Sequence, residues 1–330
     1  MQPFEWIDAT SIEHAAALLG ESGPGRRVVA KAGGIDLLDL MKEGIVRPSR
    51  VVNLRSIPGL DTISFNPGRG LVLGALATLA RIERAPEIVG NYPALAAAAA
   101  HASTPQVRNA ATIGGNLLQR PRCWYFRNEL FHGDGFDFSA AVHAGENQYH
   151  AIFGNAQSAM VHSSTPATAL VAYDASVQLS DARGQTRTVP LHEFLLPAGR
   201  TRDRDAAIEP GEVLTHVIVP APAPQTKAAY QKQTERDSYD WPICDVAAVL
   251  GMDGKRVAGA SIVMGWVAPT PRRASESERI LHGATMTGDL AREAAKAAVS
   301  AATPLSKNGY KVPMLETVLR RTILPAASAK

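Results

Sequence analysis

Two glycine-paired stretches decide the fold of this chain: Lys31-Ala32-Gly33-Gly34-Ile35-Asp36-Leu37-Leu38 and Ala111-Thr112-Ile113-Gly114-Gly115-Asn116. Each follows or ends a hydrophobic stretch and places glycines beside a small polar side chain. Because glycine adopts positive φ and has no Cβ, backbone N–H groups in such loops pack closely against a phosphate. Two loops of this kind, about 80 residues apart, predict a pyrophosphate held from two sides and hence a dinucleotide cofactor.

Neither loop follows a standard nucleotide-binding fingerprint. The chain has no Gly-x-x-x-x-Gly-Lys-Ser/Thr motif, and Gly23-Pro24-Gly25 lacks the third glycine and the strand context of a Rossmann turn. Taken alone, the first loop is also compatible with an ordinary turn. In the second loop the hydroxyl of Thr112 and the side-chain amide of Asn116 can add polar contacts to a ligand. Arg108, just upstream, either clamps this loop or is a solvated surface charge.

The composition describes a globular protein and excludes several classes of function. The 330 residues favour at least two domains, with 45% hydrophobic and 20% charged residues. The net charge of +3 is small and the basic residues are scattered, so we expect no nucleic-acid partner. No apolar run is long enough to predict a membrane span.

The N-terminus and the cysteines limit location and metal binding. The first residues lack a basic and an apolar signal region, so we expect a cytoplasmic protein, or a periplasmic one if a partner carries the export signal. The two cysteines, Cys123 and Cys244, are too few for a disulfide scaffold. Two thiols alone also hold neither an iron–sulfur cluster nor a structural zinc, so we expect no metal on this chain.

The remaining sequence predicts a chain of alternating short strands and helices. Strands are expected at 27–30, 51–54, 70–74, 213–219, 246–250 and 258–267, and helices at 11–19, 35–41, 93–101, 275–281, 287–302 and 313–324. Residues 119–150 are rich in aromatics and glycine with little periodicity, which indicates an insertion or surface excursion. The proline-rich segment 220–224 predicts a linker and a domain boundary.

Chemistry-bearing side chains outside the loops are few. Lys232 lies in a polar run and is either a surface charge or a fixed cation near a flavin, where it would favour the reduced ring. The chain has no hydrolase motif, and its nine histidines are scattered. These observations predict redox chemistry that depends on a cofactor.

Taken together, these residues resemble the FAD-binding medium subunits of molybdenum hydroxylases, a family that includes carbon monoxide dehydrogenases, xanthine dehydrogenases, hydroxybenzoyl-CoA reductases and bacterial aldehyde oxidoreductases. The resemblance runs from Phe4 to about Leu324. Besides the two loops, it is carried by Gln106-Val107-Arg108-Asn109, Gly211-Glu212-Val213-Leu214, the run from Lys232 to Asp240, and Pro304-Leu305-Ser306-Lys307-Asn308-Gly309-Tyr310-Lys311.

The resemblance implies an α+β fold. We expect a two-subdomain FAD-binding fold of the vanillyl-alcohol-oxidase (PCMH) type over residues 1–220, with subdomains 1–60 and 61–220. A C-terminal α+β domain like that of carbon monoxide dehydrogenase flavoproteins is expected over residues 225–330.

The resemblance also places the FAD contacts on particular positions. They fall on Lys31, Ala32, Gly33, Gly34, Ile35, Asp36, Leu37, Leu38, Ala102, Thr112, Gly115, Asn116, Leu214 and Lys232. Thr165 stands where the family usually has the aspartate of a Ser-Asp pair, which removes a negative charge near the flavin and a hydrogen bond at its edge. Ile35 replaces a commoner threonine and removes a hydroxyl contact with phosphate.

The segment from Leu117 to Arg127 resembles the branch whose medium subunit carries an extra four-iron cluster on an inserted loop. Such a cluster needs four cysteine ligands. This chain keeps Cys123, while Ser139 and Ala159 occupy positions that look cysteine-bearing in that branch. We therefore expect the insertion without a [4Fe-4S] cluster. Because that branch contains the aldehyde oxidoreductases, the resemblance favours an aldehyde substrate.

The resemblance implies an oxidoreductase subunit that works with partners. A large subunit would carry the molybdenum cofactor and the substrate chemistry, and a small subunit with [2Fe-2S] clusters would pass electrons to FAD on this chain. The final acceptor would be oxygen, NAD, a quinone or a redox protein, in an αβγ heterotrimer or its dimer. Two alternatives stay open: a stand-alone flavin oxidase or dehydrogenase, and a flavin-free assembly scaffold.

Overall fold

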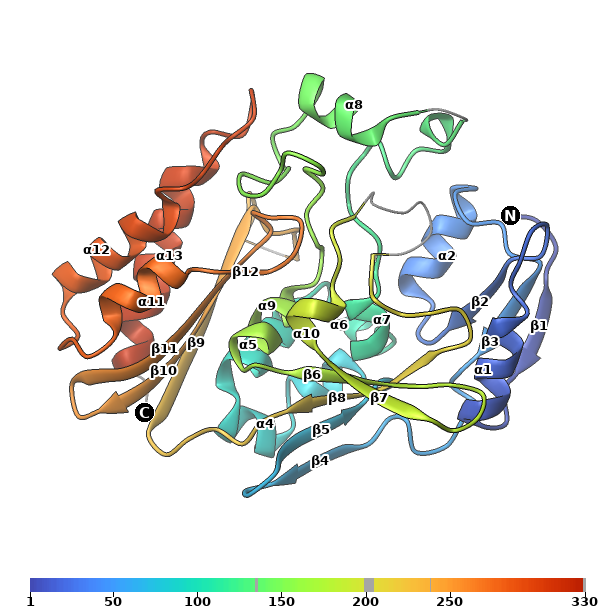
Figure 1. Ribbon diagram of the computed structural model, residues 1–330, viewed down its shortest axis with the longest axis horizontal. Coiled ribbons are helices and arrows are strands. Elements are labelled where there is room, and N and C mark those ends of the chain that lie inside the picture. Colours follow the sequence, from blue (N-terminus) through green and yellow to red (C-terminus); the bar gives the residue numbers. More distant parts are fainter. Residues whose placement is uncertain (134–135, 199–204, 238, 329–330) are drawn as a thin grey trace.

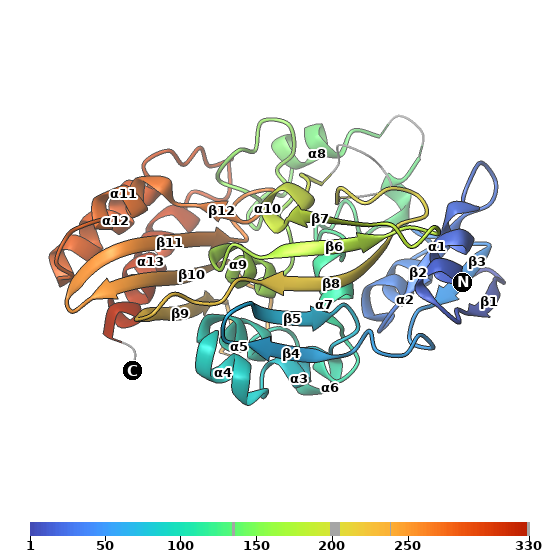
Figure 2. The same cartoon turned by 60° about the horizontal axis from the view of Figure 1, so that its bottom comes forward.

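Three β-sheets follow one another along the molecule. The computed structural model describes residues 1–133, 136–198, 205–237 and 239–328. Several predicted regions include residues outside these ranges. They are 134–135 in the insertion, 134–135 and 199–204 in the predicted FAD-binding domain, 238 in the run from Lys232 to Asp240, and 238 and 329–330 in the predicted C-terminal domain. Figures 1 and 2 show the N-terminal sheet at one end, a larger sheet in the middle, and the C-terminal sheet with its helices at the other end.

The N-terminal sheet is parallel and carries the first glycine loop at one edge. Its strands β1 (Glu5–Asp8), β2 (Val28–Lys31) and β3 (Arg50–Asn53) lie in the order β1-β3-β2. Helix α1 (Ile12–Gly20) begins after Ser11, whose hydroxyl accepts a hydrogen bond from the backbone N–H of His14. Helix α2 (Ile35–Lys42) begins after Gly34, which has φ of 81°. The loop therefore lies at the carboxyl end of β2.

The middle sheet is antiparallel and holds the largest apolar core. Its strands are β4 (Ile63–Asn66), β5 (Gly70–Gly74), β8 (Val213–Val219), β6 (Ser176–Ser180) and β7 (Thr186–Pro190), in that spatial order. Helices pack against this core: α3 (Leu79–Ile82), α4 (Pro86–Asn91), α5 (Pro93–Ala100), α7 (Ile113–Leu117), α9 (Thr165–Ala172) and α10 (Leu191–Phe194). The short helix α6 (Pro105–Arg108) contacts α3. The run of alanines in α5 gives this helix small side chains, which allow its close packing.

The C-terminal sheet is antiparallel and is covered by three helices. Its strands are β9 (Thr226–Gln233), β10 (Cys244–Asp253), β11 (Arg256–Gly265) and β12 (Arg272–Arg273), in the order β12-β11-β10-β9. The covering helices are α11 (Ser275–Leu281), α12 (Gly288–Val299) and α13 (Lys311–Ser328). The proline-rich segment 220–224 joins β8 of the middle sheet to β9 of this one.

The segment 119–150 is more ordered than an irregular surface excursion. It contains a 3-10 turn, η1 (Glu129–Phe131), and helix α8 (Phe138–Ala144), which lies at the top of the molecule in Figure 1. Its side chains Cys123, Phe126 and Val142 are buried in one apolar cluster. Aromatic side chains cluster by shape and area without any helical or strand period, so the sequence pattern did not reveal this core.

The α+β fold is confirmed, and the expected helices and strands lie within a few residues of their predicted positions. The sequence pattern missed strands β1, β4, β6 and β7, and also β9 and β12 of the C-terminal sheet. Both β1 and β7 are largely exposed and lack an apolar run, because they lie at sheet edges. Their pairing depends on backbone hydrogen bonds rather than on buried side chains.

Candidate functional site

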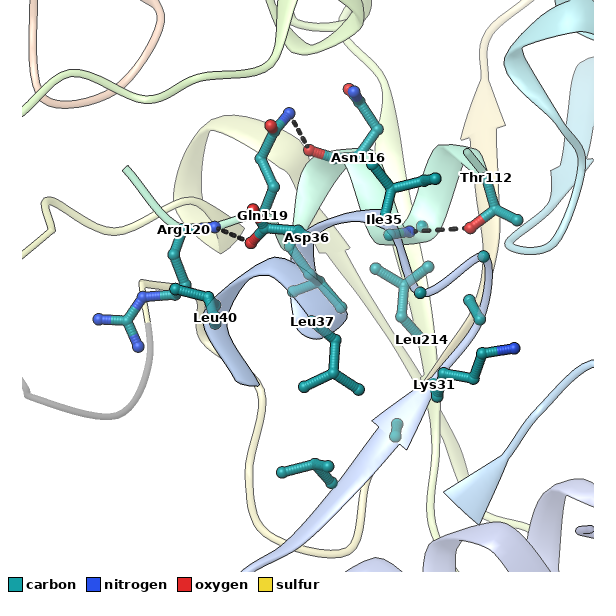
Figure 3. A pocket seen from close by; sticks show the side chains of 18 of the residues that line it. Lys31, Ile35, Asp36, Leu37, Leu40, Thr112, Asn116, Gln119, Arg120 and Leu214 are labelled. Carbon is teal, nitrogen blue, oxygen red and sulfur yellow. Dashed lines mark hydrogen bonds between the residues drawn. The ribbon is translucent and has the colours of Figure 1, made fainter. Parts of the chain in front are cut away.

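A large cavity lies where the three sheets approach one another. Its volume is about 1130 Å³, and its walls come from β2 and α2, from α7 and the segments 101–103 and 208–214, and from Lys232 and residues 240–242 of the C-terminal region. A cavity of this size, with apolar walls and a few converging polar groups, is typical of a cofactor site. Figure 3 shows the part of it between α2 and α7.

The first glycine loop touches the second directly. A Cβ on Gly33 would overlap with the carbonyl oxygen of Ala110, the residue that precedes the second loop. Gly34 has positive φ and a side chain there would meet Leu38. The absence of a side chain at Gly33 therefore allows the two backbones to pack together along one wall of the cavity.

The second loop is fixed by its own side chains. The Thr112 hydroxyl accepts a hydrogen bond from the backbone N–H of Gly115 at 3.2 Å, which caps α7. Asn116 accepts a hydrogen bond from the Ser164 hydroxyl at 2.5 Å through its side-chain oxygen. The Gln119 amide donates to the Asn116 carbonyl at 2.9 Å, as Figure 3 shows. These contacts hold the loop in shape on the cavity wall.

Lys232 supplies a cation at the opposite part of the cavity. Its ammonium group donates to the carbonyl oxygens of His101 at 2.6 Å and Asp240 at 3.0 Å. Burial lowers the pKa of Lys232, while the nearby carboxyl groups of Asp245 and Asp240 oppose this shift. The side chain is therefore not a freely solvated surface charge.

Arg108 is a buried clamp rather than a surface charge. Only 7% of its surface is exposed, and its guanidinium lies 2.6 Å from the carboxylate of Glu83. It also donates to the carbonyl of Ser103 at 2.8 Å. The segment that carries Ala102 into the cavity is thus tied to α6 and to the end of α3.

The carboxylate of Asp36 organises a cluster of arginines at the edge of the cavity. It accepts hydrogen bonds from the backbone N–H of Arg120 at 2.9 Å and from Arg127 at 2.8 Å, and it lies 2.8 Å from Arg122. The guanidinium of Arg122 also lies over the ring of Trp241, 4.6 Å from its centroid. Asp36 therefore holds the insertion against α2 instead of facing a phosphate, for which a carboxylate would be a poor ligand.

The structure brings the sequence-predicted site residues together. All of them except Leu38 line the cavity: Lys31, Ala32, Gly33, Gly34, Ile35, Asp36, Leu37, Ala102, Thr112, Gly115, Asn116, Thr165, Leu214 and Lys232. Leu38 packs instead against the apolar cluster shared by α2 and the insertion. Thr165 is buried, and its hydroxyl donates to the carbonyl of Ala98 at 3.2 Å. Their roles in binding FAD stay a prediction.

Sequence reasoning missed several lining side chains. Gln119, Arg120 and Arg122 lie on the cavity wall, and so does Trp241. The sequence offered a signal for the first three, because polar and basic residues follow the second loop directly. Trp241 had no such signal, since its position depends on how β9 and β10 meet the middle sheet.

The resemblance marks positions 123, 139 and 159 as places where a related iron–sulfur cluster would have cysteine ligands, and two of these positions lie in an apolar core. Cys123 and Ala159 belong to the same buried cluster as Phe126 and Val142. Burial raises the pKa of the Cys123 thiol to about 11, which disfavours the thiolate that a metal needs. The Ser139 hydroxyl lies 3.4 Å from the ring of His143.

The described part of the chain contains neither a cluster of metal-binding side chains nor a membrane-spanning helix. Within residues 1–133, 136–198, 205–237 and 239–328, no three His, Cys, Asp or Glu side chains are grouped so that they could hold a metal ion. Among the helices formed by these residues, none has the length and apolar character needed to cross a membrane.

Comparison with known proteins identifies the family. Residues 2–222 match the FAD binding domain in molybdopterin dehydrogenase, and residues 228–326 match the CO dehydrogenase flavoprotein C-terminal domain. The aldehyde oxidoreductase FAD-binding subunit PaoB of Escherichia coli (strain K12) is 31% identical over 319 residues, which cover 94% of this chain and 94% of that protein.

Carbon monoxide dehydrogenases give a second group of similar proteins. The medium chain from Hydrogenophaga pseudoflava is 29% identical over 324 residues, covering 97% of this chain and 96% of that one. A chain in the solved structure of carbon monoxide dehydrogenase from the same organism, in a form that lacks the Mo-pyranopterin moiety of the molybdenum cofactor, superposes with a TM-score of 0.76. It is 29% identical, with 99% of both chains covered. The chain therefore belongs to the family of FAD-binding medium subunits of molybdenum hydroxylases.

Proposed function

We propose that this chain is the FAD-carrying electron-transfer subunit of a molybdenum hydroxylase that oxidises aldehydes. The observation that carries the proposal is the cavity itself: two glycine loops, in backbone contact through Gly33 and Ala110, form one wall, and the ammonium of Lys232 forms part of another. Such a site accepts a long cofactor with a pyrophosphate in its middle and a ring that gains negative charge on reduction.

The cavity residues fit FAD in their chemistry. The backbone around Gly33 and Gly34, at the start of α2, would offer N–H groups to the pyrophosphate, and the lack of a side chain at Gly115 would let the cofactor approach the second loop closely. Ala102, Thr165 and Lys232 would surround the flavin, and Leu214 would form an apolar wall. FAD supplies the ability to accept electrons singly and to deliver them in pairs. The residues of this chain bind and orient it and place a fixed cation near the ring.

The similar proteins support the aldehyde substrate and the partner subunits. PaoB is named as the FAD-binding subunit of an aldehyde oxidoreductase, and another similar protein, from Paenarthrobacter nicotinovorans, is a subunit of the 6-hydroxypseudooxynicotine dehydrogenase complex. By analogy, a large subunit with the molybdenum cofactor and a small subunit with [2Fe-2S] clusters would assemble with this chain. The inserted segment 119–150, predicted for the aldehyde-oxidising branch, is compatible with this assignment.

The test is a visible absorption spectrum and an iron analysis of the purified chain alone. We expect flavin bands near about 370 and 450 nm and no iron, because the cavity is suited to FAD and the insertion has a single cysteine. Stoichiometric iron would contradict our reading of the insertion. A folded but colourless chain that takes up no added FAD would instead support the scaffold alternative.

The variant Asn116→Ala tests the second loop. We expect reduced FAD retention, because this substitution removes the oxygen that accepts the Ser164 hydroxyl and loosens the cavity wall. The matched control is Asn91→Ala in α4, whose amide donates to the Glu87 carbonyl and does not line the cavity. Full flavin occupancy in Asn116→Ala would remove the second loop from the proposed site. Activity with aldehydes in the reconstituted complex, without a flavin linked covalently to His or Cys, would separate the subunit from a stand-alone oxidase.

A further inference from the structure

A buried carboxyl group lies directly behind Lys232. Asp245 on β10 and Lys232 on β9 are cross-strand partners in the antiparallel register, so their side chains project to the same side of the sheet. Asp245 is fully buried, whereas Lys232 reaches the cavity. A carboxyl group with no exposure, placed beside the cation of a redox cofactor site, needs an explanation beyond packing.

The carboxyl group of Asp245 accepts hydrogen bonds from two hydroxyls. The Tyr230 hydroxyl donates at 2.7 Å and the Thr168 hydroxyl at 3.1 Å. Gly265 on β11 makes room for this arrangement, because a Cβ there would overlap with both Asp245 and Thr168. Residues of three elements, β9, α9 and β11, therefore hold this carboxyl group in the core.

The charged and titratable groups that face Asp245 are few. From β9 they are Tyr230 and Lys232, and on its own strand the neighbour is Cys244. The elements α9 and β11 contribute Thr168 and the backbone of Gly265, which carry no charge. Lys232 in turn faces the Asp240 carboxylate and the Arg108 guanidinium. Among these groups of the described chain, Lys232 is the cation that acts on Asp245.

We propose that Asp245 and Lys232 act as one charge pair, in which protonation of the buried Asp245 carboxyl sets the net positive charge that the cavity presents to the flavin. Asp245 is thus a positioning residue, since it acts on the cofactor through Lys232 and does not line the cavity. This inference rests on the proposed function, because the flavin is the group that would respond to the charge.

The surroundings of Asp245 bring the pKa of its carboxyl group close to neutral pH. Burial raises the pKa of Asp245 to about 7, and the two hydroxyls and Lys232 oppose the shift. Below this pH the carboxyl group is neutral and the pair carries one positive charge. Above it the carboxylate cancels the charge of Lys232, so the pair becomes neutral. An electron-accepting ring beside the pair is then easier to reduce at the lower pH.

The experiment is to measure the flavin midpoint potential of the holoprotein from about pH 5 to about pH 9. In the wild type we expect the potential to fall more steeply through neutral pH than ring protonation alone requires. Asp245→Asn keeps the size of the side chain and has no titrating group. We therefore expect this variant to match the wild type at the acidic end, to lie above it at the alkaline end, and to show no extra steepness.

Three further variants separate the charge pair from a structural effect. Thr168→Val removes one hydrogen bond to the carboxylate, so the steep region should move to higher pH. Lys232→Met removes a positive charge, so it should lower the flavin potential at every pH. It should also raise the pKa of Asp245, so that this carboxyl group stays protonated at moderately alkaline pH. Adding Asp245→Asn to Lys232→Met should then leave the potential unchanged there. The matched control is Asp240→Asn: pairing with Arg236 lowers the pKa of Asp240, so its loss should raise the potential without a bend near neutrality.

A measurement without flavin distinguishes a failure of this inference from a failure of the proposed function. Infrared spectroscopy of the apoprotein should show the C=O band of a protonated carboxylic acid that disappears as the pH rises through neutrality, and Asp245→Asn should lack it. A titrating band without any flavin binding would overturn the proposed function but leave Asp245 as described. No titrating band, or parallel potential curves for the wild type and Asp245→Asn, would overturn the charge pair.

Discussion

The carboxylate of Asp36 accepts a hydrogen bond from the backbone N–H of Arg120 at 2.9 Å, across 84 positions of sequence. This bond ties the first turn of α2, directly after the first glycine loop, to the chain that leaves the second loop. The same carboxylate holds Arg122 and Arg127, each at 2.8 Å. One side chain thus links both loops to the insertion that follows them.

Replacing Asp36 by Asn should destabilise this link. The substitution leaves the guanidinium groups of Arg122 and Arg127 partly buried without their main counter-charge, and we expect a loss of roughly 3 kcal/mol in the free energy of unfolding. The affinity for FAD should fall with it. Asp39→Asn is the matched control, because Asp39 contacts the same arginines but is 50% exposed, so its loss should cost about 0.5 kcal/mol. Urea unfolding and FAD titration measure both effects, and equal losses would contradict the role of Asp36.

Replacing Gly33 by Ala should force the two glycine loops apart. The new methyl group overlaps with the Ala110 carbonyl, which is backbone and cannot rotate away. We expect the free energy of unfolding to fall by about 1–3 kcal/mol and FAD retention to be lost. Gly90→Ala serves as the control, because Gly90 lies in α4 with open space around it and alanine favours a helix by about 1 kcal/mol. An unchanged flavin content in Gly33→Ala would show that the contact between the loops is not needed.

Acid should destabilise the protein through His162. Burial lowers the pKa of this imidazole from 6.5 to about 4, so the unfolded chain binds more protons than the native one between these values. Stability from this residue is therefore present above about pH 6.5 and falls as the pH drops towards 4, by at most about 3 kcal/mol. His162→Gln should flatten this part of the stability curve in denaturant titrations. His192→Gln, at an exposed side chain, should leave the curve as it is.

Lys311 should give the same direction of pH dependence as His162, with stability rising with pH, but in the alkaline range. Its ammonium donates to the carbonyls of Tyr149, His150 and Trp266 at 2.8–3.0 Å and is completely buried. Burial lowers its pKa from 10.5 to about 7, so the unfolded chain binds more protons between these values and wild-type stability rises with pH in that range.

The variant Lys311→Met should lose both this rise and the three hydrogen bonds. We expect a loss of about 1–3 kcal/mol at neutral pH that becomes larger as the pH increases, measured by chemical unfolding. Lys307→Met is the control, since Lys307 lies nearby but is 46% exposed. A constant difference between wild type and Lys311→Met over the alkaline range would refute a titrating Lys311.

The sequence allowed the fold class and most of the cavity residues to be predicted, for a physical reason. The two loops need glycine where their backbones meet, as at Gly33, and paired glycines can be recognised directly in the sequence. The helices with an apolar stripe, such as α12, are equally visible in the sequence. The family resemblance then linked these separate signals to one cofactor.

Other features depend on contacts between distant segments and left no local signal. The pairing of Asp36 with its arginines, the pairing of Arg108 with Glu83, and the place of Trp241 at the cavity were not predictable from neighbouring residues in the sequence. Asp245 reads as an ordinary charged residue in an apolar strand until the register with β9 is known. Edge strands such as β1 were missed because backbone pairing, not side-chain burial, holds them.

The walls of the cavity are drawn from residues as far apart as Leu19 and Pro242. During synthesis on the ribosome, both glycine loops emerge long before Lys232 and the end of the binding site that it forms. The cofactor therefore meets a complete binding site only when β9 and the start of β10 have left the exit tunnel, even though the N-terminal part of a chain folds first. Loading of the cofactor is in this sense a late event, which follows the folding of the sheets that hold it.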